Sequence, residues 1–154
     1  MINIFSSKTI KTGLLVGTLD ITAACTQYYI KTGKGPENVL RYVASGAFGK
    51  EAFTSGSSMI FWGLFFHYVI AMSFAFFFFW LAKIFPGILR VKLLTAALYS
   101  VFMWCVTQFL VIPLSKIPTP TATLSGALIS ISILFVCIAI PLTWMAARQM
   151  NTNK

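Results

Sequence analysis

Four long apolar stretches, separated by short polar segments, dominate the pattern of hydrophobic and polar positions. A helix needs about 20 mostly apolar residues to cross the roughly 30 Å hydrocarbon core of a bilayer. The stretches therefore predict membrane-spanning helices over about 10–31, 58–82, 93–112 and 124–147. The first is the most polar, Pro113 is expected to end the third, and Pro141 lies inside the fourth. We expect an all-α fold, a four-transmembrane-helix bundle that forms one membrane domain over 1–154.

The connection between the first two predicted spans contains a shorter helical pattern. Apolar residues recur at helical spacing from Val39 to Phe48, and Pro36 stands where the first turn of a helix tolerates proline. This pattern predicts a short amphipathic helix over about 37–49, which cannot cross the bilayer. It is expected to lie on the membrane surface or to re-enter the bundle.

Composition supports a membrane protein and narrows its partners. The chain of 154 residues is 58% hydrophobic and 10% charged, whereas soluble domains carry roughly 25% charged residues. The net charge of +9 comes from lysines and arginines, and nearly all of them lie between or just beyond the apolar stretches, without a run of four. We therefore expect the partner of these cations to be the lipid bilayer and no nucleic acid.

The distribution of lysine and arginine also predicts an orientation, because cytoplasmic segments carry an excess of both. With four spans, both termini and the connection between the second and third spans share one side. That side holds seven of the twelve basic residues and the opposite side holds five. We expect both termini to be cytoplasmic.

Asp20 lies near the middle of the first predicted span. A charged side chain there costs at least about 2.5–3.5 kcal/mol on insertion scales, so the carboxyl must face protein or a water-filled cavity. Steps of three and four residues place it on one helix face with small and polar residues: Gly13, Gly17, Ala24, Gln27 and Lys31. This face is either a packing seam alone or a packing seam with a functional acid, and Gly13 and Gly17 form a close-packing pair.

His67, the only histidine, lies at a similar depth in the second predicted span. Gly63 and Ala71 flank it at four-residue spacing, which is typical of a helix-packing face. The first two spans run in opposite directions, so Asp20 and His67 are expected to share a level in the membrane. One hypothesis is a hydrogen-bonded Asp20–His67 pair, and the alternative is a histidine bonded to a backbone or serine oxygen.

Gln27 and Gln108 form a second, weaker polar layer, because both lie late in their spans and approach the same membrane face. Together with Thr107 and Ser100 they are candidates for the lining of a shallow polar vestibule. Ordinary hydrogen bonds between helices explain these amides equally well.

The sequence gives little support for a disulfide framework, a metal site or a catalytic site. Each of the three cysteines, Cys25, Cys105 and Cys137, falls in a different apolar stretch, without the spacing of a disulfide framework or a zinc site. We expect no metal and no cofactor. Enzymatic activity is the least supported class, since one embedded acid and one histidine with no nucleophile motif do not make a catalytic set.

Three segments carry a resemblance to a known group of proteins: ASGAFGKEAFTSG at 44–56, WGLFFHYVIAMSFAF at 62–76 and VIPLSKIP at 111–118. They resemble the YagU-like family of small uncharacterised bacterial inner-membrane proteins. The resemblance implies a multi-pass protein of the bacterial inner (cytoplasmic) membrane. It transfers no catalytic residue.

Two classes of function remain open at this point. One is a small proton-linked transporter or channel component, in which Asp20 carries the proton, His67 is its partner, and Gln27 and Gln108 line the route. The other is a structural or accessory membrane subunit without transport or catalytic activity. Either class is compatible with a homo-oligomer or with membership of a larger membrane complex.

Overall fold

The computed structural model describes residues 6–117 and 123–152, and every regular element in these ranges is a helix. The longer helices are α1 (Ser7–Thr32), α2 (Glu37–Phe48), α4 (Ser58–Ile84), α5 (Lys92–Val106), α7 (Leu124–Leu134) and α8 (Ile140–Thr152). The shorter elements are α3 (Glu51–Thr54), the 3-10 helix η1 (Pro86–Arg90), the π-helical turns η2 (Thr107–Val111) and η3 (Phe135–Ala139), and α6 (Ile112–Leu114). The all-α prediction is confirmed.

Three helices in the described part of the chain are long and apolar enough to cross a membrane. They are Ser58–Ile84, Lys92–Leu114, which joins α5, η2 and α6, and Leu124–Met150, which joins α7, η3 and most of α8. α1 is long enough, with 26 residues and a length of about 39 Å. Its polar residues keep it below the hydropathy of the other three, so the predicted count of four spans is not confirmed.

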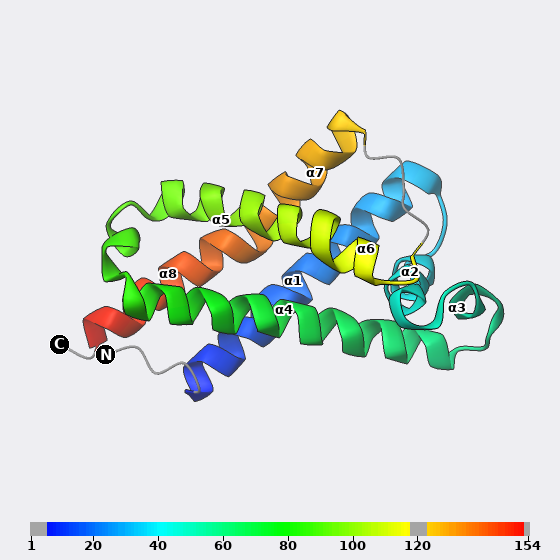
Figure 1. Ribbon diagram of the computed structural model, residues 1–154, viewed down its shortest axis with the longest axis horizontal. Helices are drawn as coiled ribbons and strands as arrows, with labels where there is room; N and C mark the ends of the chain where they lie inside the picture. Colours follow the sequence, from blue (N-terminus) through cyan, green and yellow to red (C-terminus); the bar gives the residue numbers. More distant parts are fainter. Residues whose placement is uncertain (1–5, 118–122, 153–154) are drawn as a thin grey trace.

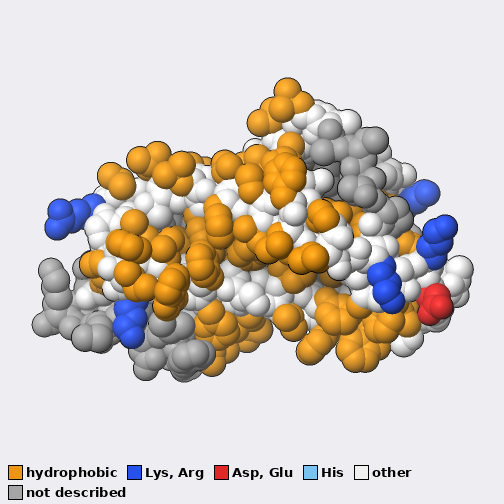
Figure 2. All heavy atoms as spheres, in the orientation of Figure 1, with side chains coloured by type: hydrophobic (Ala, Val, Ile, Leu, Met, Phe, Trp, Pro, Cys, Tyr) orange, Lys and Arg blue, Asp and Glu red, His pale blue; other side chains and the backbone are white. Residues whose placement is uncertain are grey.

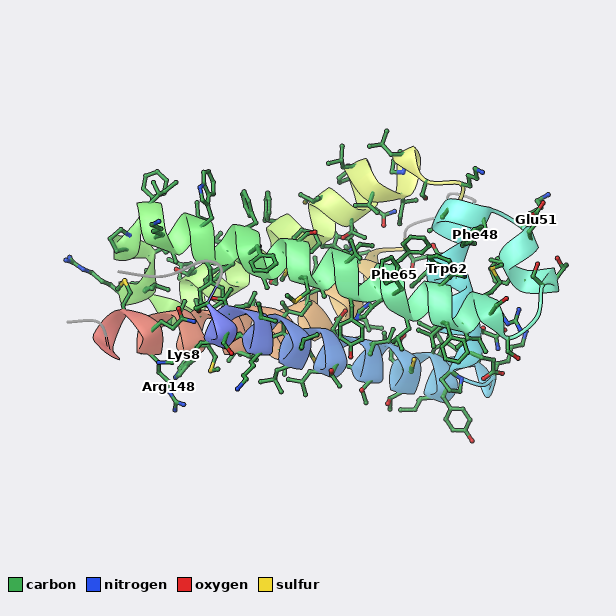
Figure 3. The ribbon with its side chains drawn as sticks, turned by 90° about the horizontal axis from the view of Figure 1, so that it is seen from below. Lys8, Phe48, Glu51, Trp62, Phe65 and Arg148 are labelled. Atoms are coloured by element: carbon green, nitrogen blue, oxygen red, sulfur yellow. The ribbon has the colours of Figure 1, made fainter. Side chains whose placement is uncertain are left out.

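The helices lie side by side in an elongated bundle with two distinct ends (Figure 1). The start of α1, the end of α8 and η1 lie at one end, whereas α2, α3 and the end of α6 lie at the other. Lysine and arginine side chains gather at both ends of the face in Figure 2, with hydrophobic side chains over the length between them. In Figure 3, Lys8 and Arg148 mark one end and Glu51 marks the other. This arrangement is typical of a protein that crosses a bilayer.

α1 and α4 run in opposite directions and meet at small residues. A Cβ atom added to Gly17 would lie 3.1 Å from the Tyr68 ring and 3.2 Å from Cβ of Ala71. One added to Gly13 would lie 2.3 Å from the sulfur of Met72. The predicted packing positions Gly13, Gly17 and Ala71 therefore lie in the α1–α4 contact.

Gly63, the fourth predicted packing position, serves a different contact. A Cβ atom added there would lie 1.9 Å from the backbone oxygen of Leu40, so Gly63 lets α2 press its backbone onto α4. Aromatic rings close the same contact: the centroid of Phe48 lies 5.8 Å from that of Trp62 and 6.1 Å from that of Phe66. Figure 3 shows Phe48, Trp62 and Phe65 together where α2 meets α4.

Polar contacts hold the α2 end of the bundle together. Nη1 of Arg41 donates to the carbonyl oxygens of Ala52, at 3.0 Å, and Ser55, at 2.6 Å, and so fixes the short helix α3, which the sequence did not predict. The backbone N–H of Lys116 donates to the carbonyl of Gly46 at 3.0 Å. The segment after α6 is therefore tied to α2, whereas residues 118–122 of the connection to α7 lie outside the described residues.

Pro113 does not end the third span, which continues through α6 to Leu114. A proline inside a helix lacks an N–H group, and its ring clashes with the carbonyl four residues earlier. The π turn η2 ends two residues before Pro113, and η3 ends two residues before Pro141. Each wide turn contains the carbonyl with which the proline ring would clash, so the helix continues past the proline.

Candidate functional site

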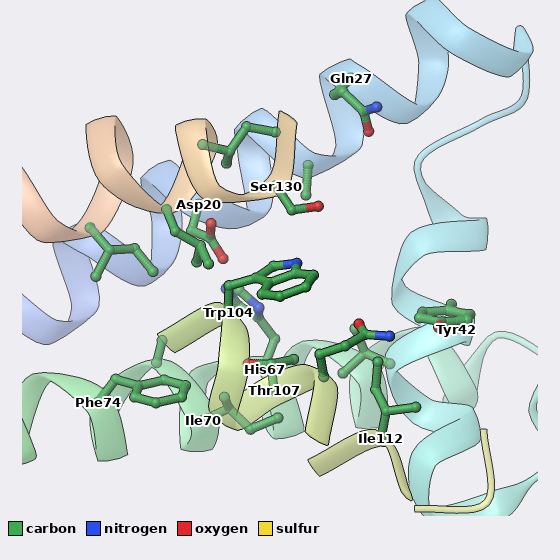
Figure 4. Close-up of a pocket in the computed structure, with 17 residues that line it drawn as sticks. Asp20, Gln27, Tyr42, His67, Ile70, Phe74, Trp104, Thr107, Ile112 and Ser130 are labelled. Carbon is green, nitrogen blue, oxygen red and sulfur yellow. The ribbon is translucent and has the colours of Figure 1, made fainter. Parts of the chain in front are cut away.

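A cavity of about 440 Å³ opens between α1, α2, α4, the α5–η2–α6 rod and the α7–η3 segment (Figure 4). Its wall includes all four residues that the sequence singled out for a polar pathway, namely Asp20, Gln27, His67 and Gln108. Each of the four side chains is half-buried. The structure thus brings together groups from α1, α4 and η2 that are up to 88 positions apart in the chain.

Asp20 projects from α1 into this cavity, and Figure 4 shows its carboxyl and the His67 imidazole pointing toward one another. Across the described residues its carboxyl forms no hydrogen bond or ion pair. It does interact electrostatically with His67 and with Cys137 of η3. The acid is therefore held in place by its helix, while its oxygens stay available to whatever enters the cavity.

His67 is positioned by the backbone of α1. Its Nε2 lies 2.8 Å from the carbonyl oxygen of Gly17, and a carbonyl oxygen only accepts, so Nε2 carries the hydrogen. Nδ1 is then the nitrogen free to accept a proton. The structure contains the alternative bond to a backbone oxygen, and no direct Asp20–His67 hydrogen bond is found within the described ranges.

The α1–α4 contact has a second polar link one residue along each helix. The hydroxyls of Thr18 and Tyr68 are 2.8 Å apart. With the His67–Gly17 bond, this link sets the rotation of α1 against α4. Asp20 is three residues beyond Gly17, and this rotation directs it toward the cavity.

The polar layer predicted around the two amides is found in part. Gln27, Gln108 and Thr107 lie on the cavity wall. Ser100 does not: it is buried within α5 and donates to the carbonyl of Ala97 at 2.8 Å. The Ser100 hydroxyl bonds a backbone carbonyl of its own helix, so it needs no partner in the cavity.

A second cavity of about 400 Å³ adjoins the first on the side of α2. The two share five wall residues: Tyr42, Val43, Ile70, Thr107 and Ile112. The second cavity also reaches Ser115 and Ile117, after the end of α6. The two cavities therefore meet at these shared side chains, and the second lies nearer the α2 end of the bundle.

Comparison of the chain with protein-family models, curated proteins and solved structures gives no match. The resemblance to the YagU-like family therefore stays a prediction. The site has to be interpreted from its own geometry.

Several wall residues were not singled out from the sequence, and the most prominent is Trp104. A tryptophan near the middle of a predicted span, away from the membrane interfaces where this residue is enriched, was the available signal. Tyr42 and Ser130 gave no comparable signal, because the first belongs to the amphipathic helix and the second is one of several serines.

The chemistry of the wall is limited. No group of three or more His, Cys, Asp or Glu residues able to hold a metal occurs in the described part of the chain. One carboxyl, one imidazole and two amides can bind and pass protons and can hydrogen-bond a guest.

We expect His67→Gln to preserve the α1–α4 contact and His67→Ala to weaken it. A glutamine amide can still donate to the Gly17 carbonyl, whereas alanine removes a hydrogen bond worth about 1 kcal/mol. Thermal unfolding in detergent measures the difference, with Ser73→Ala, an exposed change on the same helix, as the control. If His67→Ala unfolds at the wild-type temperature, the Gly17 bond does not stabilise the bundle.

Proposed function

We propose that this chain is a four-span protein of the bacterial inner membrane, with both termini in the cytoplasm, and that it acts as a small proton-linked transporter or channel component. Asp20 carries the proton in this proposal, His67 is its partner, and Gln27 and Gln108 line the route. The single observation that carries it is an embedded acid whose carboxyl faces a cavity together with an imidazole. Ionisable residues inside a membrane mark ion and proton pathways by default.

The two faces of α1 support its assignment as the fourth span. Its outer face carries large apolar side chains, and Leu14, Leu15 and Leu19 are 47%, 48% and 42% exposed. Its inner face carries Gly17 against α4 and Asp20 toward the cavity. The exposed leucines suit this part of α1 to lipid although the mean hydropathy of the helix is low.

The positions of the chain ends support an even number of crossings. The start of α1 and the end of α8 lie at the same end of the bundle, together with η1 (Figure 1). The excess of lysine and arginine predicted for that side favours a cytoplasmic location.

The adjoining cavities suggest the route. A proton or guest that enters at the α2 end would pass the shared wall residues, among them Tyr42 and Thr107, before it reaches Asp20. The free Nδ1 of His67 can accept a proton that leaves the carboxyl, because Nε2 is engaged with α1.

Reconstitution into lipid vesicles tests this function. The purified chain is inserted into vesicles that contain a pH-sensitive dye, and a pH difference is imposed with and without a membrane potential. We expect the lumen pH to change faster than in protein-free vesicles. Absence of proton flux, alone or with any of a panel of candidate ions, would contradict the proposal and favour an accessory subunit, whose expected signature is co-purification with a larger membrane complex.

A further inference from the structure

The cavity wall has an unexpected charge balance for a chain with a net charge of +9. Of its 17 lining residues, Asp20 is the one acid and none is lysine or arginine. The imidazole of His67 has one nitrogen already committed to the Gly17 carbonyl. An anionic guest would face the carboxylate without a permanent cation to offset it, so the wall favours a guest with positive charge.

Aromatic rings add to this preference. Trp104 from α5, Tyr42 from α2 and Phe74 from α4 all contribute to the wall. In the view of Figure 4 the Trp104 ring overlaps the His67 side chain, and both residues line the same cavity as Asp20. The face of an aromatic ring attracts a cation, most strongly where water is excluded, and tryptophan is the best of the three rings.

The size of the cavity and its remaining side chains indicate what kind of cation fits. A volume of about 440 Å³ lies in the usual range for small-molecule sites, roughly 300–1,000 Å³. Six of the other wall residues are branched and apolar: Val43, Ile70, Ile112, Ile133, Leu134 and Ile138. A metal cation requires several oxygen ligands, whereas Asp20 supplies the one carboxylate here. An organic cation with an apolar body matches both parts of the wall.

We propose that the cavity binds a small organic cation, with its charge held between the Asp20 carboxylate and the Trp104 ring and its body among the apolar side chains. This proposal rests on the proposed function, because it assigns a substrate class to the same site. Binding exchanges one positive charge for another: the protonated carboxyl releases its proton to solvent as the cation enters. Such an exchange would couple movement of the cation in one direction to movement of a proton in the other.

Few other groups around Asp20 can titrate. His67 faces it from α4, and Cys137 interacts with it from η3. Tyr42 contributes from α2, where burial raises the pKa of the phenol and keeps it uncharged. The wall residues from the α5–η2–α6 rod and from α7 are not titratable. Proton release on binding therefore reports on Asp20, with His67 as the second group to test.

Calorimetry of the purified full chain in detergent tests the inference. The probe is benzyltrimethylammonium, and benzyl alcohol and benzylsulfonate are its uncharged and anionic counterparts. We expect binding of the cation alone, weaker at pH 5.5 than at pH 8. Titrations in two buffers of different ionisation enthalpy should show about one proton released per cation at acidic pH. Equal binding of benzyl alcohol, or cation binding without pH dependence, would overturn the inference.

Variants add a second line of evidence. We expect Asp20→Asn to weaken binding of the cation by roughly tenfold or more, since it removes the negative charge, and Asp20→Glu to retain binding. Glu51→Gln makes the same change of charge at the α2 end of the bundle and should leave binding unchanged. The comparison of the three ligands uses the unaltered protein, so it decides the matter even if Asp20→Asn fails to fold.

The outcomes separate this inference from the proposed function. Cation binding with proton release but without flux in vesicles would support the site and contradict transport. Proton flux without binding of the cation would support transport and overturn the assignment of the guest.

Discussion

Replacing Asp20 by asparagine should reduce the proton flux of the reconstituted protein to the level of protein-free vesicles. Asparagine has the same shape but carries no titratable proton, and Asp20 is the only acid on the wall of the cavity. The carboxyl makes no hydrogen bond with other residues of the described chain, so its loss should leave the fold and the elution profile in detergent unchanged. The measurement is the rate of dye response under an imposed pH difference.

Glu51→Gln is the matched control for this experiment, because it removes one carboxyl from the α2 end and none from the cavity. It should transport at the wild-type rate. Asp20→Glu keeps the acid and should retain part of the flux. If Asp20→Asn transports like the wild type, the carboxyl is not the proton carrier. If it lowers stability and the wild type shows no flux, Asp20 has a structural role alone.

Gly63→Ala should destabilise the bundle by about 1–3 kcal/mol, the usual cost of adding volume to a tight contact. The new Cβ would lie 1.9 Å from the backbone oxygen of Leu40 and 2.6 Å from its carbonyl carbon. A backbone cannot rotate away as a side chain can, so α2 must move off α4. Alanine favours a helix over glycine by roughly 1 kcal/mol, which offsets part of the loss.

Thermal unfolding and hydrogen exchange of the α2 amides measure this effect. We expect a lower unfolding temperature and faster exchange in Glu37–Phe48. Gly56→Ala is the control, because a Cβ there meets nothing within 4 Å. Wild-type exchange in Gly63→Ala would show that α2 does not rest on α4 at this glycine.

Much of the helical layout could be predicted from apolar runs. The expected spans over 58–82 and 124–147 correspond to Ser58–Ile84 and Leu124–Met150. Leucine-, isoleucine- and phenylalanine-rich runs of that length have few alternatives to a long helix, and their ends are marked by lysines and prolines. The status of the first span could not be settled in the same way. Asp20, Gln27 and several threonines lower its hydropathy. The insertion cost of Asp20 predicts that its polar face turns inward, and Asp20 and Gln27 do line the cavity.

The shared level of Asp20 and His67 could be predicted from the sequence. Asp20 and His67 share a level because their helices run in opposite directions, and that argument needs no tertiary detail. Which of the two proposed partners His67 would bond could not be predicted. The His67 bond to Gly17 depends on how closely α1 approaches α4. The contact of α2 with Gly63 depends on the path of the segment 49–57, whose short helix α3 was not predicted.

Ile112, which directly follows η2, shows why part of the wall was missed. The direction of a side chain on a helix follows from a constant angle per residue, and the wide turn η2 breaks that constancy directly after α5. A second such turn, η3, interrupts the last helix before Ile140. If the α-helical period is continued across either turn, the residues beyond the turn are assigned to the wrong face of the helix. The positions of these turns are visible only in the structure.

The two π turns also bear on how the bundle could change shape. A π turn contains one residue more than an α turn, and it can move along its helix by exchanging one backbone hydrogen bond for another. Each such step swings the residue concerned through roughly 100° and leaves both ends of the rod where they were. For Gln108, which belongs to η2, one step would turn the amide away from the cavity. Movement of a π turn along its helix could thus bring side chains into the cavity or take them out of it, without displacement of the whole helix.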